Sequence, residues 1–68
     1  MLSLKVNGEE LQLAVRTVAD LLQAQQIALE RKGIAVALNG AVVPRRNWAQ
    51  TALAHGDAVE IITARQGG

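Results

Sequence analysis

Two glycines, Gly67 and Gly68, end the sequence after a short polar stretch, and they are the first candidates for chemistry. A carboxylate is a poor electrophile, but joining it to AMP gives a mixed anhydride that a nucleophile can attack, with AMP as the leaving group. Glycine suits such a position because, without a Cβ, it runs extended through a narrow channel and adopts φ values that other residues avoid. The pair indicates a chain that is modified by an activating enzyme, whereas the simpler alternative is a loose and featureless end.

The other reactive residue types form no recognisable active site. The sequence has no cysteine, which excludes disulfides, cysteine-ligated zinc and a thiol nucleophile. Its single histidine, His55, lies in a His-Gly-Asp segment that is typical of a turn, and Asp57 is expected to hold that turn through its own side chain. The glycines before the tail stand singly, so no phosphate-binding loop is indicated. We therefore expect no catalytic residue, no metal and no cofactor in this chain.

Size, composition and charge exclude several classes of partner. The chain has 68 residues, half of them hydrophobic, which is enough for the core of one small domain. A formal net charge of +1 and a lone aromatic residue, Trp48, provide neither the basic surface nor the stacking platform of a nucleic-acid-binding protein. No apolar run approaches the roughly 20 residues of a membrane span, and the N-terminal residues do not have the profile of a signal peptide. We expect a cytoplasmic protein that binds neither nucleic acid nor membranes.

The first hairpin is predicted by the stretch LSLKVNGEELQLAV. Apolar and polar residues alternate on both sides of Asn7-Gly8, a dipeptide typical of two-residue hairpin turns. Such a turn places Leu4 opposite Leu11 and Lys5 opposite Glu10. The leucines then share one face of the hairpin, and an opposite-charge pair lies on the other.

A second hairpin is predicted by IAVALNGAVV, which turns at Asn39-Gly40. Pro44 is expected to end its outgoing strand, because proline donates no backbone hydrogen bond to a sheet. The following segment RRNWAQ, residues 45–50, is expected to form no more than one turn of helix. Its Trp48 is expected to anchor that turn onto the sheet.

One amphipathic helix is predicted between the two hairpins. Thr17 can cap the backbone N–H groups of the first turn, and Asp20 can reach back to the cap residue, as in a capping box. The helix is expected to end near Gln26. Its apolar residues, at positions i, i+3 and i+4, form one stripe that needs a sheet to cover: Val18, Leu21 and Leu22.

The last predicted element is a strand over residues 58–64. Its nearly continuous apolar character is typical of a strand with neighbours on both sides. Two hairpins, a helix between them and a final strand predict an α+β fold, a mixed sheet with the helix across one face, known as the β-grasp or ubiquitin-like architecture. We expect residues 1–68 to form a single domain of this kind, with residues 64–68 as a flexible tail that leaves from the end of the sheet.

Alternation along the final strand suggests a docking surface beside the tail. If Val59 and alternate residues after it point toward the helix, Ile62 and Ala64 lie on the open face of the sheet. Apolar side chains exposed beside a reactive chain end are typical of a surface that binds a partner. Arg45 and Arg46 could attract an acidic partner, although paired arginines at a turn are more often a solvated surface.

Five segments of the sequence together match one known family. They are VNGEE, TVADLL, VALNGAVVPRRNW, GDAVEII and the closing GG. On these segments the chain resembles the ThiS family, the sulfur-carrier proteins of thiamine biosynthesis, over essentially its whole length. The specific part is the Val-Pro-Arg-x-x-Trp element at residues 43–48 together with the Gly-Gly end, because the hairpins alone fit many folds.

The resemblance implies a carrier that partner enzymes act upon. In the family, an E1-like adenylyltransferase of the ThiF type uses ATP to adenylate the C-terminal glycine. Sulfur derived from a cysteine desulfurase converts the adenylate to a thiocarboxylate, and a thiazole synthase of the ThiG type receives the sulfur. By this resemblance Gly68 bears the adenylate and then the sulfur, and Gly67 threads the tail. Ala37, where a glutamate is expected, and Arg65-Gln66 depart from the family pattern.

Three alternative functions use part of the same sequence evidence. The small subunit of molybdopterin synthase has the same fold and tail but binds the large subunit of that synthase. A ubiquitin-like protein modifier also uses a Gly-Gly end, and it would form conjugates with lysines of target proteins. A nucleotide- or RNA-sensing β-grasp module is disfavoured by the nearly neutral charge.

Overall fold

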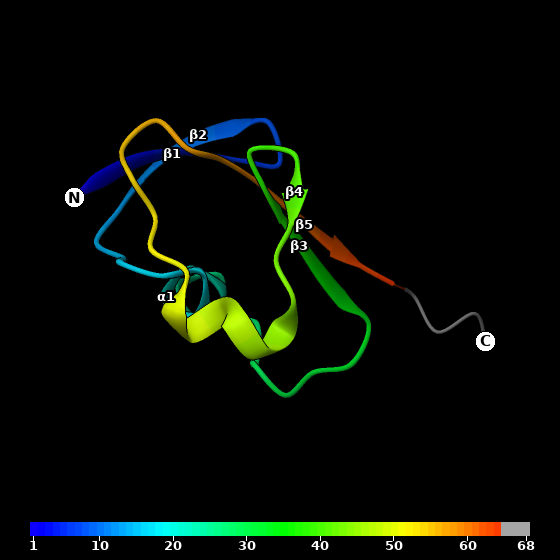
Figure 1. Ribbon diagram of the computed structural model, residues 1–68. Helices are drawn as coiled ribbons and strands as arrows, with labels where there is room; N and C mark the ends of the chain where they lie inside the picture. Colours follow the sequence, from blue (N-terminus) through cyan, green and yellow to red (C-terminus); the bar gives the residue numbers. More distant parts are fainter. Residues whose placement is uncertain (65–68) are drawn as a thin grey trace.

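Five strands form one mixed sheet in the computed structural model, which describes residues 1–64 (Figure 1). The strands are β1 (Leu2–Val6), β2 (Glu9–Leu13), β3 (Ile34–Leu38), β4 (Ala41–Val42) and β5 (Ala58–Thr63), in the order β2-β1-β5-β3-β4. The central strand β5 runs parallel to β1 and antiparallel to β3. Helix α1 (Val18–Ala24) and the 3₁₀ helix η1 (Arg45–Gln50) pack together on one side of the sheet. This arrangement confirms the predicted α+β, β-grasp fold with a central final strand.

The hairpin of β1 and β2 has the predicted register. Leu4 lies opposite Leu11, and Lys5 lies opposite Glu10. Asn7-Gly8 forms the turn with φ values of 51° and 84°, and positive φ at both positions is the signature of a type I′ turn. The leucine face packs toward the core, since Leu4 is buried and Leu11 is partly buried against it.

Both hydrogen bonds of the predicted capping box are present at the start of α1. The Asp20 N–H donates to Thr17 Oγ1 at 3.1 Å, and the Thr17 N–H donates to Asp20 Oδ2 at 3.3 Å. The helix ends at Ala24, and Gln26 takes a positive φ of 62°, so the end lies close to the predicted position. The helix buries its apolar stripe against the sheet: Val18, Ala19, Leu21 and Leu22.

We expect Thr17→Ala to destabilise the protein by about 1 kcal/mol, because the Asp20 N–H then loses its acceptor at the helix start. Urea denaturation followed by circular dichroism would measure the change as a lower midpoint with an unchanged slope. Thr17→Ser is the matched control, since it keeps the hydroxyl and is expected to retain most of the stability. Equal midpoints for Thr17→Ala and the parent protein would contradict a stabilising role of the cap.

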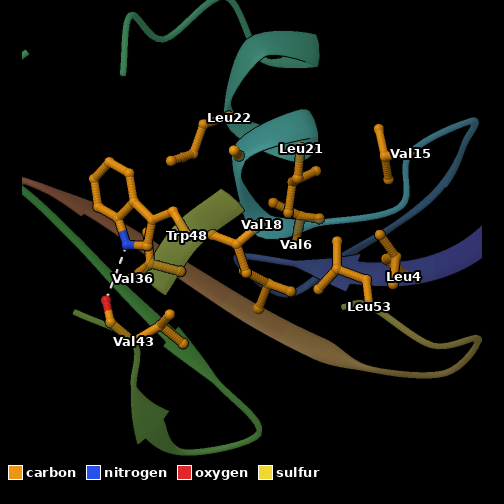
Figure 2. Packing of buried hydrophobic residues seen from close by; sticks show 12 residues of the cluster. Leu4, Val6, Val15, Val18, Leu21, Leu22, Val36, Val43, Trp48 and Leu53 are labelled. Atoms are coloured by element: carbon orange, nitrogen blue, oxygen red, sulfur yellow. Dashed lines mark hydrogen bonds between the residues drawn. The ribbon is translucent and has the colours of Figure 1, made fainter. Parts of the chain in front are cut away.

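Residues Arg45–Gln50 form a longer helix than expected. At about three residues per turn, the six residues of η1 make two turns of 3₁₀ helix, so the prediction of at most one turn was wrong. The burial of Trp48 accounts for the greater length of the helix, because this side chain is only 3% exposed and packs into the hydrophobic core. Its Nε1–H donates to the Val43 carbonyl at 2.9 Å, as Figure 2 shows, which confirms Trp48 as the anchor.

The core lies between the sheet and the two helices. Figure 2 shows side chains from α1, η1 and the strands meeting in one cluster. Among the described residues 1–64, the buried members of this cluster lie within residues 4–59: Leu4, Val6, Val15, Val18, Ala19, Leu21, Leu22, Val36, Val43, Trp48, Leu53 and Val59.

Candidate functional site

The end of β5 is held on one side by the loop that precedes β3. Ala64, the residue after the strand, donates its backbone N–H to the Gly33 carbonyl at 2.7 Å. Gly33 has a φ of +80°, and a Cβ at this position would lie 3.3 Å from the Ala64 oxygen. Glycine therefore permits both the turn and the close approach. The central strand is supported by its neighbour up to Ala64, whereas Gly67 and Gly68 lie outside the described residues.

On the other side of β5, the side chain of Asn7 takes the place of a strand. β1 pairs with β5 only through Lys5 and Val6, after which the chain turns back into β2. Asn7 Nδ2 donates to the Ile61 carbonyl at 3.2 Å, and the Ile61 N–H donates to Asn7 Oδ1 at 2.7 Å. The sequence predicts Asn7 only as a turn residue, so its contact with Ile61 was not foreseen. The available signal was its amide, which offers both a donor and an acceptor, as a backbone does.

An apolar patch lies on the face of the sheet that points away from α1. As alternation predicted, Val59 is 1% exposed in the core whereas Ile62 is 58% exposed on the open face. Ile62 pairs with Ala35 across the strands, and Ala37 pairs with Val42, which is 76% exposed. We call Ala35, Ala37, Val42 and Ile62 the open-face patch. Only Ile62 was selected from sequence, because the strand order decides which residues lie beside it.

Ala64 extends the exposed surface toward the tail. It is exposed and follows Ile62 by two positions, just after the end of β5. The carboxylate of Glu60 lies on the same face, since Glu60 pairs with Ala37. The apolar patch therefore has an acidic neighbour on the side away from the tail.

The two arginines selected from sequence have different surroundings. The Arg45 guanidinium donates to the backbone carbonyl of Leu29 and, at 2.5 Å, to that of Arg31. Its Cζ also lies 4.6 Å from the centroid of the Trp48 ring, a cation–π contact. Arg45 thus joins η1 to the loop before β3, a contact that the sequence pattern does not predict. The side chain of Arg46 is exposed.

The turn before β5 has the structural role that was expected of it. The Ala54 N–H donates to Asp57 Oδ2 at 2.8 Å, and Asn39 Nδ2 donates to Asp57 Oδ1 at 3.0 Å. His55 Nδ1 accepts a hydrogen bond from the Ser3 N–H at 3.2 Å. Both polar side chains are therefore used to hold this turn against β1 and the second hairpin.

Within residues 1–64, no three His, Asp or Glu side chains are grouped closely enough to hold a metal ion. In the same part of the chain, every buried polar side-chain atom has a hydrogen-bond partner. None of the described helices has the length and apolar character needed to span a membrane.

Known proteins share the fold of this chain. A sequence model of the ThiS family matches residues 4–68. The crystal structure of the thiamine biosynthesis protein ThiS from Geobacter metallireducens is 33% identical, with a TM-score of 0.80 over 98% of this chain and 100% of that chain. An NMR structure of a thiamine biosynthesis protein from the same organism is also 33% identical, with a TM-score of 0.79 over 98% of this chain and 88% of that one. The search of curated proteins found no match.

Proposed function

The chain belongs to the ThiS family, and from this premise we propose that Gly68 is adenylated, converted to a thiocarboxylate and used to supply sulfur to a thiazole synthase. As a member of this family the protein is a small sulfur carrier in thiamine biosynthesis and not a catalyst. The observation that supports the proposal most is the extent of the family match, which continues through Gly67 to Gly68.

The proposed chemistry takes place at the carboxylate of Gly68. An oxygen of the carboxylate attacks the α-phosphorus of ATP in a ThiF-type enzyme, which forms the acyl adenylate and releases pyrophosphate. The terminal sulfur of a persulfide formed by a cysteine desulfurase then attacks the carbonyl carbon, and AMP leaves. A thiol reduces the S–S bond of the resulting acyl disulfide, which frees the thiocarboxylate and leaves a disulfide as the other product. ATP belongs to the activating enzyme, and we propose that the carrier itself holds no cofactor. Gly67, which has no Cβ, lets the tail pass through a narrow channel to the nucleotide.

The described residues support a rigid presentation of this tail. β5 lies in the centre of the sheet, and both sides of its end are hydrogen-bonded, through Asn7 on one side and Gly33 on the other. We propose that the open-face patch, which includes Ile62, docks against the activating enzyme together with Ala64. Burial of such an apolar surface by a partner makes the free energy of association more favourable.

We expect the protein to gain the mass that corresponds to exchange of one oxygen for sulfur when it is incubated with a ThiF-type enzyme, ATP and a sulfur donor. Mass spectrometry of the C-terminal peptide should locate the change on Gly68. Omission of ATP is the control, because adenylation then cannot occur. An unchanged mass in the complete reaction would contradict the proposed function.

The sulfur acceptor distinguishes the proposed function from its nearest alternative. The thiocarboxylate is expected to disappear on incubation with a ThiG-type thiazole synthase and the other substrates of that enzyme. Incubation with the large subunit of molybdopterin synthase and its substrate should leave the thiocarboxylate in place. The reverse result would assign the protein to molybdopterin synthesis.

A further inference from the structure

Four cationic residues lie in two segments that Arg45 joins, the loop before β3 and the start of η1. Arg31 and Lys32 are exposed in the loop before β3, and Arg45 and Arg46 begin η1. Glu30 is the one carboxylate in these two segments, so they carry a clear positive excess although the formal charge of the whole chain is only +1. The other segments together are therefore net negative.

Arg45 holds the two basic segments together. Its guanidinium donates to the carbonyls of Leu29 and Arg31, both in the loop before β3, while it stacks on the buried Trp48. A guanidinium has a fixed fork of donors, so it can bind two backbone carbonyls of one loop at once. The loop is thereby fastened to η1, and the side chains of Arg31 and Lys32 stay exposed.

The same loop is joined to the end of β5. Gly33, the next residue after Lys32, accepts the hydrogen bond from the Ala64 N–H. In Figure 1 the green loop between α1 and β3 lies beside the end of the orange strand β5, where the C-terminal segment begins. A continuous set of contacts therefore runs from Trp48 through Arg45 and the loop to Ala64.

The geometry of these charges fits a broad acidic surface. The cations are exposed and spread along two segments, whereas a small phosphate ligand is usually held by groups that converge in a pocket. At physiological ionic strength the Debye length is about 8 Å, so these charges act chiefly on a partner that comes close to the tail. Such charges orient a partner and raise its rate of association more than they strengthen the final complex.

We propose that Arg31, Lys32 and Arg46 form a basic docking surface that binds an acidic surface of the activating enzyme beside the entrance for the tail. Arg45 is a positioning residue, which acts by holding the loop that carries Arg31 and Lys32. This inference rests on the proposed function, and it adds the chemistry by which the activating enzyme recognises the carrier.

Lys32→Glu tests the basic surface, and Arg16→Glu is its matched control. Both replace an exposed cation by glutamate and change the net charge equally, but Arg16 precedes the N-terminus of α1, whereas Lys32 follows its C-terminus. The Michaelis constant for the carrier is measured by pyrophosphate exchange with a ThiF-type enzyme at low and at high salt. At low salt Lys32→Glu should raise KM on the order of tenfold with kcat nearly unchanged, while Arg16→Glu should match the parent.

The salt dependence decides between the outcomes. The difference between Lys32→Glu and the parent should shrink as salt increases, because exposed charges are screened. The docking proposal would be overturned by equal KM values for the two variants, or by a Lys32→Glu defect that persists at high salt. In either case, normal adenylation of the parent protein would leave the proposed function intact. Absence of adenylation in the parent protein would overturn both. Thermal melts of both variants should coincide with that of the parent, since both side chains are exposed.

Discussion

Deletion of Gly68 is expected to abolish thiocarboxylate formation and to leave thermal unfolding unchanged. One residue of extended chain spans about 3.3–3.6 Å, so the carboxylate of Gly67 would stop well short of the position where Gly68 reacts. Because a misplacement of about 1 Å can lower a rate roughly 100-fold, a shortfall of this size should reduce sulfur transfer below detection. Folding should be unaffected, since residues 4–59 supply the buried core of the part of the chain that the structure describes.

Mass spectrometry after incubation with the activating enzyme, ATP and a sulfur donor would measure the effect. Gly68→Ala is the matched control for length, because it keeps the reach of the tail and adds only a Cβ. If the length of the tail is decisive, Gly68→Ala should retain part of the activity. Comparison of the two variants thus distinguishes the effect of tail length from the effect of side-chain volume. Modification of the shortened chain at the parental rate would refute the assignment of the reaction to Gly68.

Ile62→Glu is expected to keep the fold and to impair adenylation severely. The side chain is 58% exposed, so its carboxylate stays in water and the cost to stability is about 0.5–1 kcal/mol of strand preference. If the activating enzyme covers the open-face patch, it must desolvate an unpaired charge in the complex. A penalty of about 2 kcal/mol or more corresponds to a roughly 30-fold or larger rise in KM. Pyrophosphate exchange measures this effect.

Two variants control for folding and for charge. Val59→Glu, on the other face of the same strand, buries a carboxylate at a position that is 1% exposed. It should unfold the protein, because the free-energy cost of burying an unpaired carboxylate is comparable to the whole free energy of unfolding of a small domain. Gln12→Glu adds the same negative charge at an exposed position of β2, and its partner Ser3 lies on the open face away from the patch. It should leave folding and adenylation unchanged. A normal adenylation rate for Ile62→Glu would exclude the open-face patch as the docking surface.

Local signals predicted the elements because the residues that determine each of them are close in sequence. The Asn7-Gly8 turn has both φ values positive, as a type I′ hairpin requires, and the register of Leu4 with Leu11 follows directly from a turn of two residues. The capping box of Thr17 and Asp20 likewise involves residues three positions apart. The length of η1 was underestimated because Trp48 stabilises it through burial, which a six-residue window does not reveal.

The sequence by itself determined the hairpins, the helix and the faces of the final strand, and it contains the Gly-Gly pair on which the proposed chemistry rests. The tertiary structure decided how the base of the tail is held. The Asn7 side chain is hydrogen-bonded to Ile61, which lies 54 positions away in the sequence. Arg45 donates hydrogen bonds to two carbonyls of a distant loop, and the Gly33 carbonyl accepts a hydrogen bond from the Ala64 N–H. Periodicity and turn residues report which way a side chain faces, because backbone geometry repeats locally. They do not report which distant segment a side chain contacts, because that contact depends on the spatial order of the strands in the sheet and on how the helices pack against it.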